Sequence, residues 1–207
     1  MYRVIDFFYT EKCYRHVKSC LKIYREILRQ KGLTDAHIYQ VSSVINGDST
    51  CSYICELTWK SQAHWEKARD LLIENAALST PVATLRNKVL SMKGTPLIQG
   101  QVSSPRCHHK KPMILFDVIR VAKSLNHRYT EMWQHASRYM SSRTGYLSSE
   151  LIAMESPDDT AAFVNIARWG NESCFRDAFN TPDFMRIISG FEPYCSLYLC
   201  EEIHYDS

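Results

Sequence analysis

The sequence predicts an α+β protein of two tandem ferredoxin-like units, each with the element order β-α-β-β-α-β. Two observations predict it. The same order of strand and helix patterns occurs in each half of the 207 residues, and aromatic residues of the halves coincide at a shift of 110 positions. One face of such a sheet is covered by helices and the other is bare. We therefore expect the two antiparallel sheets to pack together as an α+β barrel.

In the first half, residues 1–99, we expect strands at Tyr2–Tyr9, His37–Ile45 and Thr50–Trp59, and helices at about Glu11–Gln30 and Gln62–Glu74. Asn46-Gly47 between the second and third strands is typical of a hairpin turn. Ser61 can cap the second helix, and Thr80-Pro81 is typical of the start of a further helical piece. The last strand is either Val89–Met92 or Pro96–Gln99.

The second half, residues 113–207, repeats this order after a linker at 100–112 that is rich in Ser, Pro and His. We expect strands at Met113–Val121, Leu147–Met154, Ala161–Trp169 and Leu197–His204, and helices at Asn126–Ser141, Glu172–Phe179 and from Thr181-Pro182 to Gly190. Asn171 can cap the second of these helices.

The register between the halves supports a true duplication. At a shift of 110, the coincident pairs are Thr50 with Thr160, Tyr53 with Phe163, Trp59 with Trp169, and Trp65 with Phe175. No gap is needed across the hairpin and the helix that follows it. A shared strand, turn, strand, cap and helix pattern is harder to obtain by chance than one tryptophan match.

Composition excludes several classes of protein. The formal net charge is +3, from 25 basic and 22 acidic residues that are well mixed, so neither nucleic acid nor a membrane surface is indicated as a partner. No apolar run is long enough to span a bilayer, and the first residues lack the apolar core of a signal peptide. The eight cysteines include no C-x-x-C pair. We expect a cytoplasmic protein with reduced thiols.

Several runs in the second half resemble the antibiotic biosynthesis monooxygenase (ABM) family. They are Thr144-Gly-Tyr-Leu-Ser-Ser-Glu-Leu, Phe163-Val-Asn-Ile-Ala-Arg-Trp, Phe175-Arg-Asp-Ala-Phe and Thr181-Pro-Asp-Phe. The first half resembles the family only through Thr58-Trp59-Lys60-Ser61 and the order of elements. The resemblance implies the dimeric α+β barrel fold, here in a tandem arrangement.

The resemblance also implies a site. Cofactor-free oxygenases of this family line an apolar pocket with an Asn-x3-Trp-x5-Tyr arrangement, which Asn165 and Trp169 match and in which Phe175 replaces the tyrosine. The corresponding residues of the first half are Cys55, Trp59 and Trp65, so we expect the catalytic pair to be Asn165 and Trp169. The further candidates for the substrate pocket are Phe163, Phe175, His127, Tyr53, Cys55, Trp59 and Trp65.

The physical chemistry of these residues allows two interpretations. A carboxamide on an apolar strand face offers donors and an acceptor to a carbonyl or an oxyanion, and an indole four residues along can stack on a planar ring. Alternatively, Trp169 packs the sheet against a helix and Asn165 satisfies local backbone groups. His127 is either a base at the pocket mouth or a surface or capping residue.

Metal and heme sites are not indicated. Cys107-His108-His109 has no second ligand pair at zinc spacing, so a solvated linker is the preferred interpretation. Heme-degrading relatives have an Asn on the first strand and a His on the last helix; here these positions hold Val118-Ile119-Arg120 and Phe184-Met-Arg-Ile-Ile-Ser. We expect no cofactor and no metal.

The sequence therefore leads to three hypotheses. The first is a cofactor-independent monooxygenase-like protein with an apolar pocket for a phenolic or polycyclic small molecule. The second is a non-catalytic small-molecule-binding or regulatory α+β barrel module. The third is a purely structural role, with a homodimer formed through exposed helices. A cavity near Asn165 distinguishes the first two from the third.

Overall fold

The computed structural model describes residues 1–9, 32–47, 49–74, 89–100, 112–155 and 160–203. The chain divides into two compact units. Unit 1 comprises residues 1–40, 49–95 and 203–207, and unit 2 comprises residues 41–48 and 96–202. The helix expected at Glu11–Gln30, the helical piece at Thr80-Pro81 and most of the linker lie outside the described residues.

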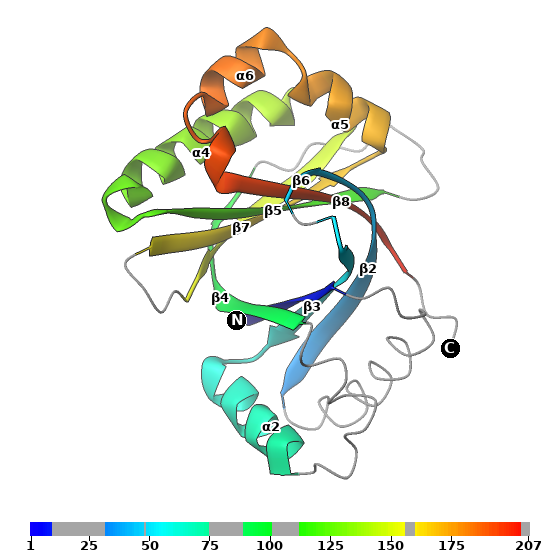
Figure 1. Cartoon of the computed structure of the whole chain (residues 1–207), viewed down its shortest axis with the longest axis vertical. Coiled ribbons are helices and arrows are strands. Elements are labelled where there is room, and N and C mark those ends of the chain that lie inside the picture. Colours follow the sequence, from blue (N-terminus) through cyan, green and yellow to red (C-terminus); the bar gives the residue numbers. More distant parts are fainter. Residues whose placement is uncertain (10–31, 48, 75–88, 101–111, 156–159, 204–207) are drawn as a thin grey trace. The chain divides into compact units, whose positions relative to one another are not determined.

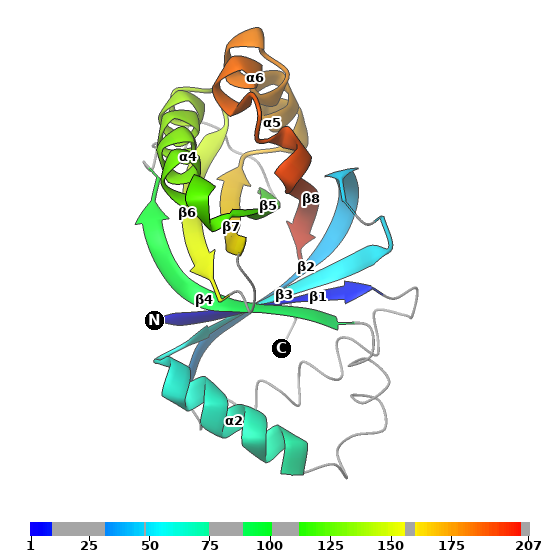
Figure 2. The same ribbon diagram turned by 60° about the vertical axis from the view of Figure 1, so that its left-hand side comes forward.

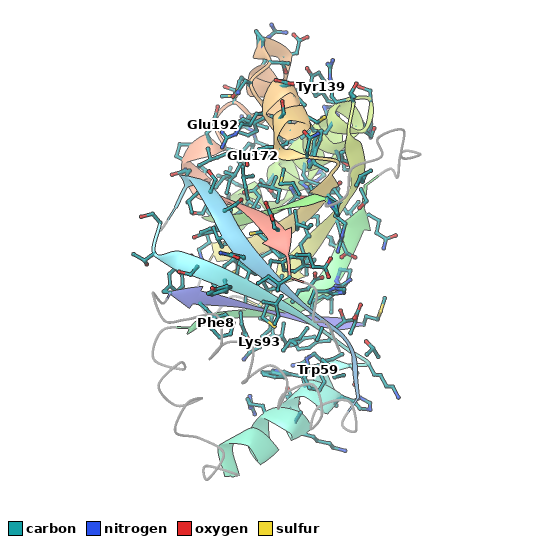
Figure 3. The ribbon with its side chains drawn as sticks, turned by 90° about the vertical axis from the view of Figure 1, so that its right-hand side faces the viewer. Phe8, Trp59, Lys93, Tyr139, Glu172 and Glu192 are labelled. Atoms are coloured by element: carbon teal, nitrogen blue, oxygen red, sulfur yellow. The ribbon has the colours of Figure 1, made fainter. Side chains whose placement is uncertain are left out.

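Unit 1 contains an antiparallel sheet and the helix α2. Its elements are β1 (Tyr2–Tyr9), β2 (Leu33–Asn46), β3 (Cys51–Trp59), α2 (Gln62–Glu74) and β4 (Val89–Gln99). β1 pairs with β3 and β4, and β2 pairs with β3. Apolar residues at alternate positions of β3 pack with α2, and Figure 3 shows Trp59 at the α2 end of this strand. The burial of these residues holds α2 on one face of the sheet.

Unit 2 has four strands of its own under three helices. Its elements are β5 (Met113–Ala122), η2 (Lys123–Leu125), α4 (Asn126–Ser141), β6 (Tyr146–Met154), β7 (Thr160–Trp169), α5 (Glu172–Phe179), α6 (Pro182–Ile188), η3 (Glu192–Tyr194) and β8 (Cys195–Glu202). β5 pairs with β7 and β8, and β6 pairs with β7, all antiparallel. α4, α5 and α6 cover one face of these strands (Figures 1 and 2).

The capping residues expected in unit 2 are in place. The Asn171 side chain accepts a hydrogen bond of 2.8 Å from the Cys174 backbone N–H at the start of α5. The Thr181 hydroxyl accepts one from the Phe184 N–H at the start of α6, where Pro182 occupies the first helical position. Both caps satisfy backbone donors that a helix end leaves free.

Trp59 and Trp169 occupy equivalent positions, as the register between the halves predicts. Each is the last residue of its strand and lies against the aromatic residue six positions later. The ring centroids of Trp59 and Trp65 are 5.5 Å apart, and those of Trp169 and Phe175 are 5.7 Å apart. This equivalence confirms the prediction that both tryptophans lie on like elements.

A glycine precedes the partner strand in each unit. Gly32 and Gly145 both have positive φ, +99° and +83°. The carbonyl oxygen of each accepts a hydrogen bond from the residue that follows the strand-ending tryptophan, Lys60 in unit 1 and Gly170 in unit 2. A side chain at either glycine would be strained, so both turns depend on glycine.

The order of hydrogen-bonded strands is β1-β3-β2-β8-β5-β7-β6-β4, and it closes on itself as an eight-stranded barrel. This confirms the predicted α+β fold class. β2 and β4 each continue from unit 1 into unit 2, to which residues 41–46 and 96–99 belong. The sequence allows the last strand of the first half to be either Val89–Met92 or Pro96–Gln99. β4 includes both ranges.

Candidate functional site

A cavity of about 210 Å³ lies in unit 2 between the helix-covered face of the sheet and the helices. Its lining is mostly apolar and comes from both layers. The sheet contributes Leu115, Ala167, Trp169 and Leu197, and the helices contribute Tyr129, Met132, Trp133, Ala136, Met140, Phe175, Phe179, Phe184, Met185 and Ile188. The lining includes Ile45 and Met185, which are 36% and 39% exposed, so the cavity reaches the surface there.

Strand alternation places the polar residues of this cavity. Asn165, Ala167 and Trp169 lie at alternate positions of β7 and all line the cavity, whereas Val164 and Ile166 are buried on the other face. The sequence predicts this separation of the two faces.

Asp117 and Asn165 form a polar pair on the cavity floor. They are register partners on the neighbouring strands β5 and β7, so their side chains leave the sheet on the same face. Oδ1 of Asp117 and Oδ1 of Asn165 are enclosed and have no hydrogen-bond partner among the residues that the structure describes. The same is true of Nε1 of Trp169. Enclosed polar atoms normally have partners, so these three atoms mark where a ligand can bond.

The environment of Asp117 favours its neutral form. Desolvation raises the pKa of this carboxyl to about 7, and a hydrogen bond from the Cys195 thiol opposes the shift. The same thiol lies 3.4 Å from the Phe191 carbonyl oxygen, so it has two acceptors within reach. Burial, and then the charge of Asp117, raise the pKa of the Cys195 thiol and of the Tyr129 phenol above their usual values. Both groups therefore remain protonated around Asp117.

A chain of three hydroxyl groups forms the second polar region of the cavity. The Tyr146 hydroxyl donates to Ser149 Oγ at 2.7 Å, and Ser149 Oγ lies 3.1 Å from Ser137 Oγ on α4. All three residues line the cavity. Gly100 packs directly on this chain, because a Cβ atom there would lie 2.2 Å from Ser149 Oγ. Burial raises the pKa of the Tyr146 phenol.

Aromatic rings form one wall of the cavity. The ring of Trp169 packs edge-on against the rings of Tyr146 and Phe175, with ring-centroid distances of 5.4 Å and 5.7 Å. Phe175 in turn lies 5.3 Å from Phe179. Edge-on packing fixes the ring planes and leaves a rigid apolar surface on which a planar ligand can lie.

The end of β2 completes the lining. Ile45 and Asn46 belong to unit 2 and line the cavity. The Asn46 side-chain amide donates to the Cys195 carbonyl oxygen at 2.7 Å and to that of Glu192 at 3.4 Å. Glu192 also lines the cavity and is labelled in Figure 3. Asn46 thus ties the strand end to the segment that carries Cys195.

The structure brings together three of the residues that the sequence singles out. Asn165, Trp169 and Phe175 all line the cavity. Phe163 lies two positions before Asn165 on β7 and does not line the cavity. Its ring stacks on that of Tyr129, with the ring centroids 5.0 Å apart. Phe163 therefore supports the cavity wall through Tyr129.

The remaining candidates lie elsewhere. His127 is on the exposed side of α4, with its side chain 86% exposed and 3.6 Å from the Glu131 carboxylate, and it is not among the residues that line the cavity. Tyr53, Cys55, Trp59 and Trp65 are buried in the core cluster of unit 1 and do not line the cavity. Cys55 and Trp59 follow the strand alternation expected of them, but apolar side chains pack against them.

Sequence reasoning missed Asp117, Cys195 and the hydroxyl chain. The signal for Asp117 was available: it is the acid in the apolar run Met113–Val121, on the same face as Leu115 and Ile119. Tyr146 lies 23 positions before Trp169 in the sequence, and only the β6–β7 register brings the two side by side.

Solved structures with the same fold support this assignment of architecture. An anthrone oxidase-like protein matches with a TM-score of 0.72 at 8% identity, over 98% of this chain and 91% of that one. A monooxygenase-like protein of Listeria innocua matches with a TM-score of 0.56 at 13% identity, over 100% and 96% of the chains. A ferredoxin-fold protein of Listeria monocytogenes related to antibiotic biosynthesis monooxygenases gives 0.55 at 13%, over 99% and 96%.

These TM-scores establish a shared fold, and the resemblance to ABM proteins is confirmed at that level. No protein-family model and no curated protein sequence matches the chain. Within the described ranges, no group of His, Cys, Asp or Glu side chains is placed to hold a metal ion. None of the helices described there is long and apolar enough to cross a bilayer. Cys107-His108-His109 lies outside the described residues.

Proposed function

We propose that the protein is a cofactor-independent monooxygenase that oxidises a phenolic or polycyclic aromatic molecule in the cavity of unit 2. One observation carries the proposal. An apolar, aromatic-walled cavity contains enclosed polar atoms of Asn165 and Trp169 that have no hydrogen-bond partner in the described part of the chain. A ligand that carries oxygen on an aromatic ring supplies both the apolar surface and the missing hydrogen-bond partner.

The chemistry needs a substrate that is itself a reductant. An electron-rich aromatic such as an anthrone loses a proton, and the resulting carbanion gives electrons to O2. The peroxide formed at that carbon then loses water, so that a CH2 group and O2 become a C=O group and H2O. The protein must bind the ring, stabilise the oxyanion and exclude bulk water, which the apolar lining can do.

Asn165 and Trp169 have separate roles in this proposal. The Asn165 carboxamide offers donors to the oxyanion of the ionised substrate. The ring of Trp169, fixed by Tyr146 and Phe175, supplies the surface on which the substrate lies. The Trp169 indole N–H, which has no acceptor in the described part of the chain, can donate to a second substrate oxygen.

Phe175 has no hydroxyl, but the cavity does not lack one. Tyr146 places a phenol beside Trp169 and holds it by a hydrogen bond to Ser149. A proton donor is thus available on β6 in place of the tyrosine that the family resemblance implies at position 175. This supports the oxygenase over a non-catalytic binding module.

Oxygen consumption tests the proposal. Uptake is measured with a panel of anthrones and quinols, without added flavin, metal or heme. We expect Asn165→Ala to lower turnover by roughly 10–1000-fold, the range for removing one preorganised donor. Little stability should be lost, because Asn165 Oδ1 accepts no hydrogen bond from the residues that the structure describes. Asn180→Ala is the matched control, since Asn180 is exposed beyond α5 and does not line the cavity.

The binding-module hypothesis gives a different result. In that case Trp169→Ala weakens binding of the same compounds, and neither the wild type nor any variant consumes oxygen. Equal turnover of the wild type and Asn165→Ala would also contradict the proposed role of Asn165.

A further inference from the structure

The floor of the cavity holds a carboxyl group that the family resemblance does not assign. Asp117 faces the cavity from β5, directly across the β5–β7 ladder from Asn165. Its Oδ1 is enclosed and has no hydrogen-bond partner within the described ranges. In the part of the chain that the structure describes, Asp117 has no salt bridge, unlike the buried Glu56, which pairs with Arg3.

The surroundings of Asp117 are built from neutral groups. Among the described residues, the titratable side chains that face it are the Cys195 thiol from β8 and the Tyr129 phenol from α4. Glu192 of η3 acts on Cys195, and its own carboxylate accepts a hydrogen bond from the Gly190 N–H at 2.7 Å. A carboxyl group kept in an apolar cavity without a cation is costly to ionise, which makes it a strong proton acceptor once ionised.

We propose that Asp117 is the catalytic base of this cavity and that its carboxylate selects aromatic ligands that carry a free hydroxyl or enol group. The proposal rests on the proposed function for its catalytic step, whereas the selection of hydroxyl groups stands on the geometry alone. Asn165, as the register partner of Asp117, is placed to donate to the same ligand oxygen.

The proton moves through Asp117 and back. The carboxylate takes the proton of the substrate, which leaves a substrate anion and a neutral carboxylic acid. The anion adds O2, and the acid returns the proton to the peroxide. Asp117 then takes the C–H proton as the O–O bond breaks, and gives it to the departing hydroxide, so the net products are the ketone and water.

The same carboxylate discriminates between ligands. A free aromatic hydroxyl donates to Asp117, whereas the methyl ether of the same ring offers no donor and leaves the carboxylate unpaired. The pKa of Asp117 is near 7, so the carboxylate is present above this pH and the discrimination grows with pH through about 7. Below it, the neutral acid bonds an ether oxygen nearly as well as a hydroxyl.

The experiment uses the full-length protein and two matched probes, 2-naphthol and 2-methoxynaphthalene, with binding measured by calorimetry at about pH 5.5 and pH 8.5. We expect the wild type to prefer the naphthol by at least about tenfold at the higher pH, the size of one charge-assisted hydrogen bond. The preference should fall below about threefold at the lower pH. Asp117→Asn should prefer the naphthol by less than about threefold at both pH values. Asp177→Asn, the same change at an exposed position of α5, should match the wild type.

Each result decides the proposal. Equal affinity of the wild type for both probes, no binding of either, or an unchanged preference in Asp117→Asn would overturn it. Oxygen uptake by the same variants separates it from the proposed function. Uptake that Asp117→Asn retains in full would reject the base and keep the oxygenase. A naphthol preference that depends on Asp117, without uptake on any substrate, would reject the oxygenase and keep the recognition of hydroxyl groups.

Discussion

At the scale of single residues, the site is defined by side chains that interrupt an apolar pattern. On one face of β5, Asp117 lies between Leu115 and Ile119. On the same face of the neighbouring strand β7, Asn165 lies between Phe163 and Ala167. The family resemblance implies a role for Asn165 and Trp169 and implies none for Asp117. Alternation alone could have identified Asp117, since it predicts that an acid at this position faces the helices.

The raised pKa of Asp117 has a consequence for stability. A carboxyl whose folded-state pKa lies above its unfolded value destabilises the fold as pH rises from about 4 to about 7. Asp117→Asn removes this cost. We expect the variant to be more stable than the wild type by about 1–3 kcal/mol at pH 8, a figure reduced from the full shift because water can enter the cavity.

The measurement is urea unfolding of both proteins at several pH values. The difference in unfolding free energy should shrink as the pH falls from about 7 to about 4, because below about pH 4 Asp117 is protonated in both the folded and the unfolded state. A variant that is less stable than the wild type at pH 8 would show that Asp117 has a stabilising partner.

Phe175 offers a test at the same scale. It lines the cavity and is 1% exposed, with its ring edge-on to Trp169. Phe175→Tyr restores the hydroxyl that the family resemblance implies, so turnover of an electron-rich phenol should be retained or increased, as measured by oxygen uptake. A loss of more than about tenfold would mean that the added hydroxyl is left without a partner in an apolar wall.

At the scale of elements, the sequence was most informative where a local signal exists. α4 and α5 have the bounds that their periodicity and the Asn171 cap predict. β2 begins at Leu33, before the expected His37, and β4 is a single long strand. The added residues at the start of β2 pair with the end of β3, and β4 pairs with β1 at the start of the sequence. No local pattern predicts either pairing.

The Asn171 cap positions the aromatic wall, because α5 carries Phe175 and Phe179. Asn171→Ala removes the acceptor of the Cys174 N–H and should cost about 1 kcal/mol of stability. The midpoint of thermal unfolding measures the loss, with Asn180→Ala as the reference because it lies at the other end of α5. Equal midpoints for the two variants would show that the cap does not contribute.

Gly100 tests the hydroxyl chain. Its N–H donates to the Ser149 carbonyl oxygen at 2.8 Å, and a Cβ atom would lie 2.2 Å from Ser149 Oγ and 2.5 Å from Ser137 Oγ. Gly100→Ala must therefore displace the chain and should cost about 1–3 kcal/mol, the usual cost of overpacking. Urea unfolding gives the size of the loss. A neutral substitution would mean that the two serines move without cost.

At the scale of the whole molecule, the duplication could be predicted from the sequence. Which of the two copies contains the cavity could be predicted only in part. The two tryptophans mark the repeat, and the loss of the asparagine at Cys55 indicates the second copy as the site. The cavity itself depends on packing between layers, which no sequence pattern specifies. The homodimer through exposed helices stays a prediction.

Ligand binding should therefore affect the copies unequally. Hydrogen exchange with and without 2-naphthol should show slower exchange in α4, α5 and α6, which line the cavity, and unchanged exchange in α2. Slower exchange in α2 alone would place the binding site in the first copy.

The cysteines provide a second test on the whole chain. The five that the structure describes, Cys51, Cys55, Cys174, Cys195 and Cys200, are all free thiols. We expect thiol counting under denaturing, non-reducing conditions to find all eight of the chain free. A count of six or fewer would contradict this.

The continuation of β2 into unit 2 has a genetic consequence. Ile45 and Asn46 wall the cavity, yet their codons lie in the first copy, whereas those of Asp117 and Asn165 lie in the second. A gene fragment that encodes the second copy alone would lack the side chain that holds the Cys195 segment. A substitution at Ile45 or Asn46 should therefore alter the cavity of unit 2, whereas one at Cys55 should alter the core of unit 1.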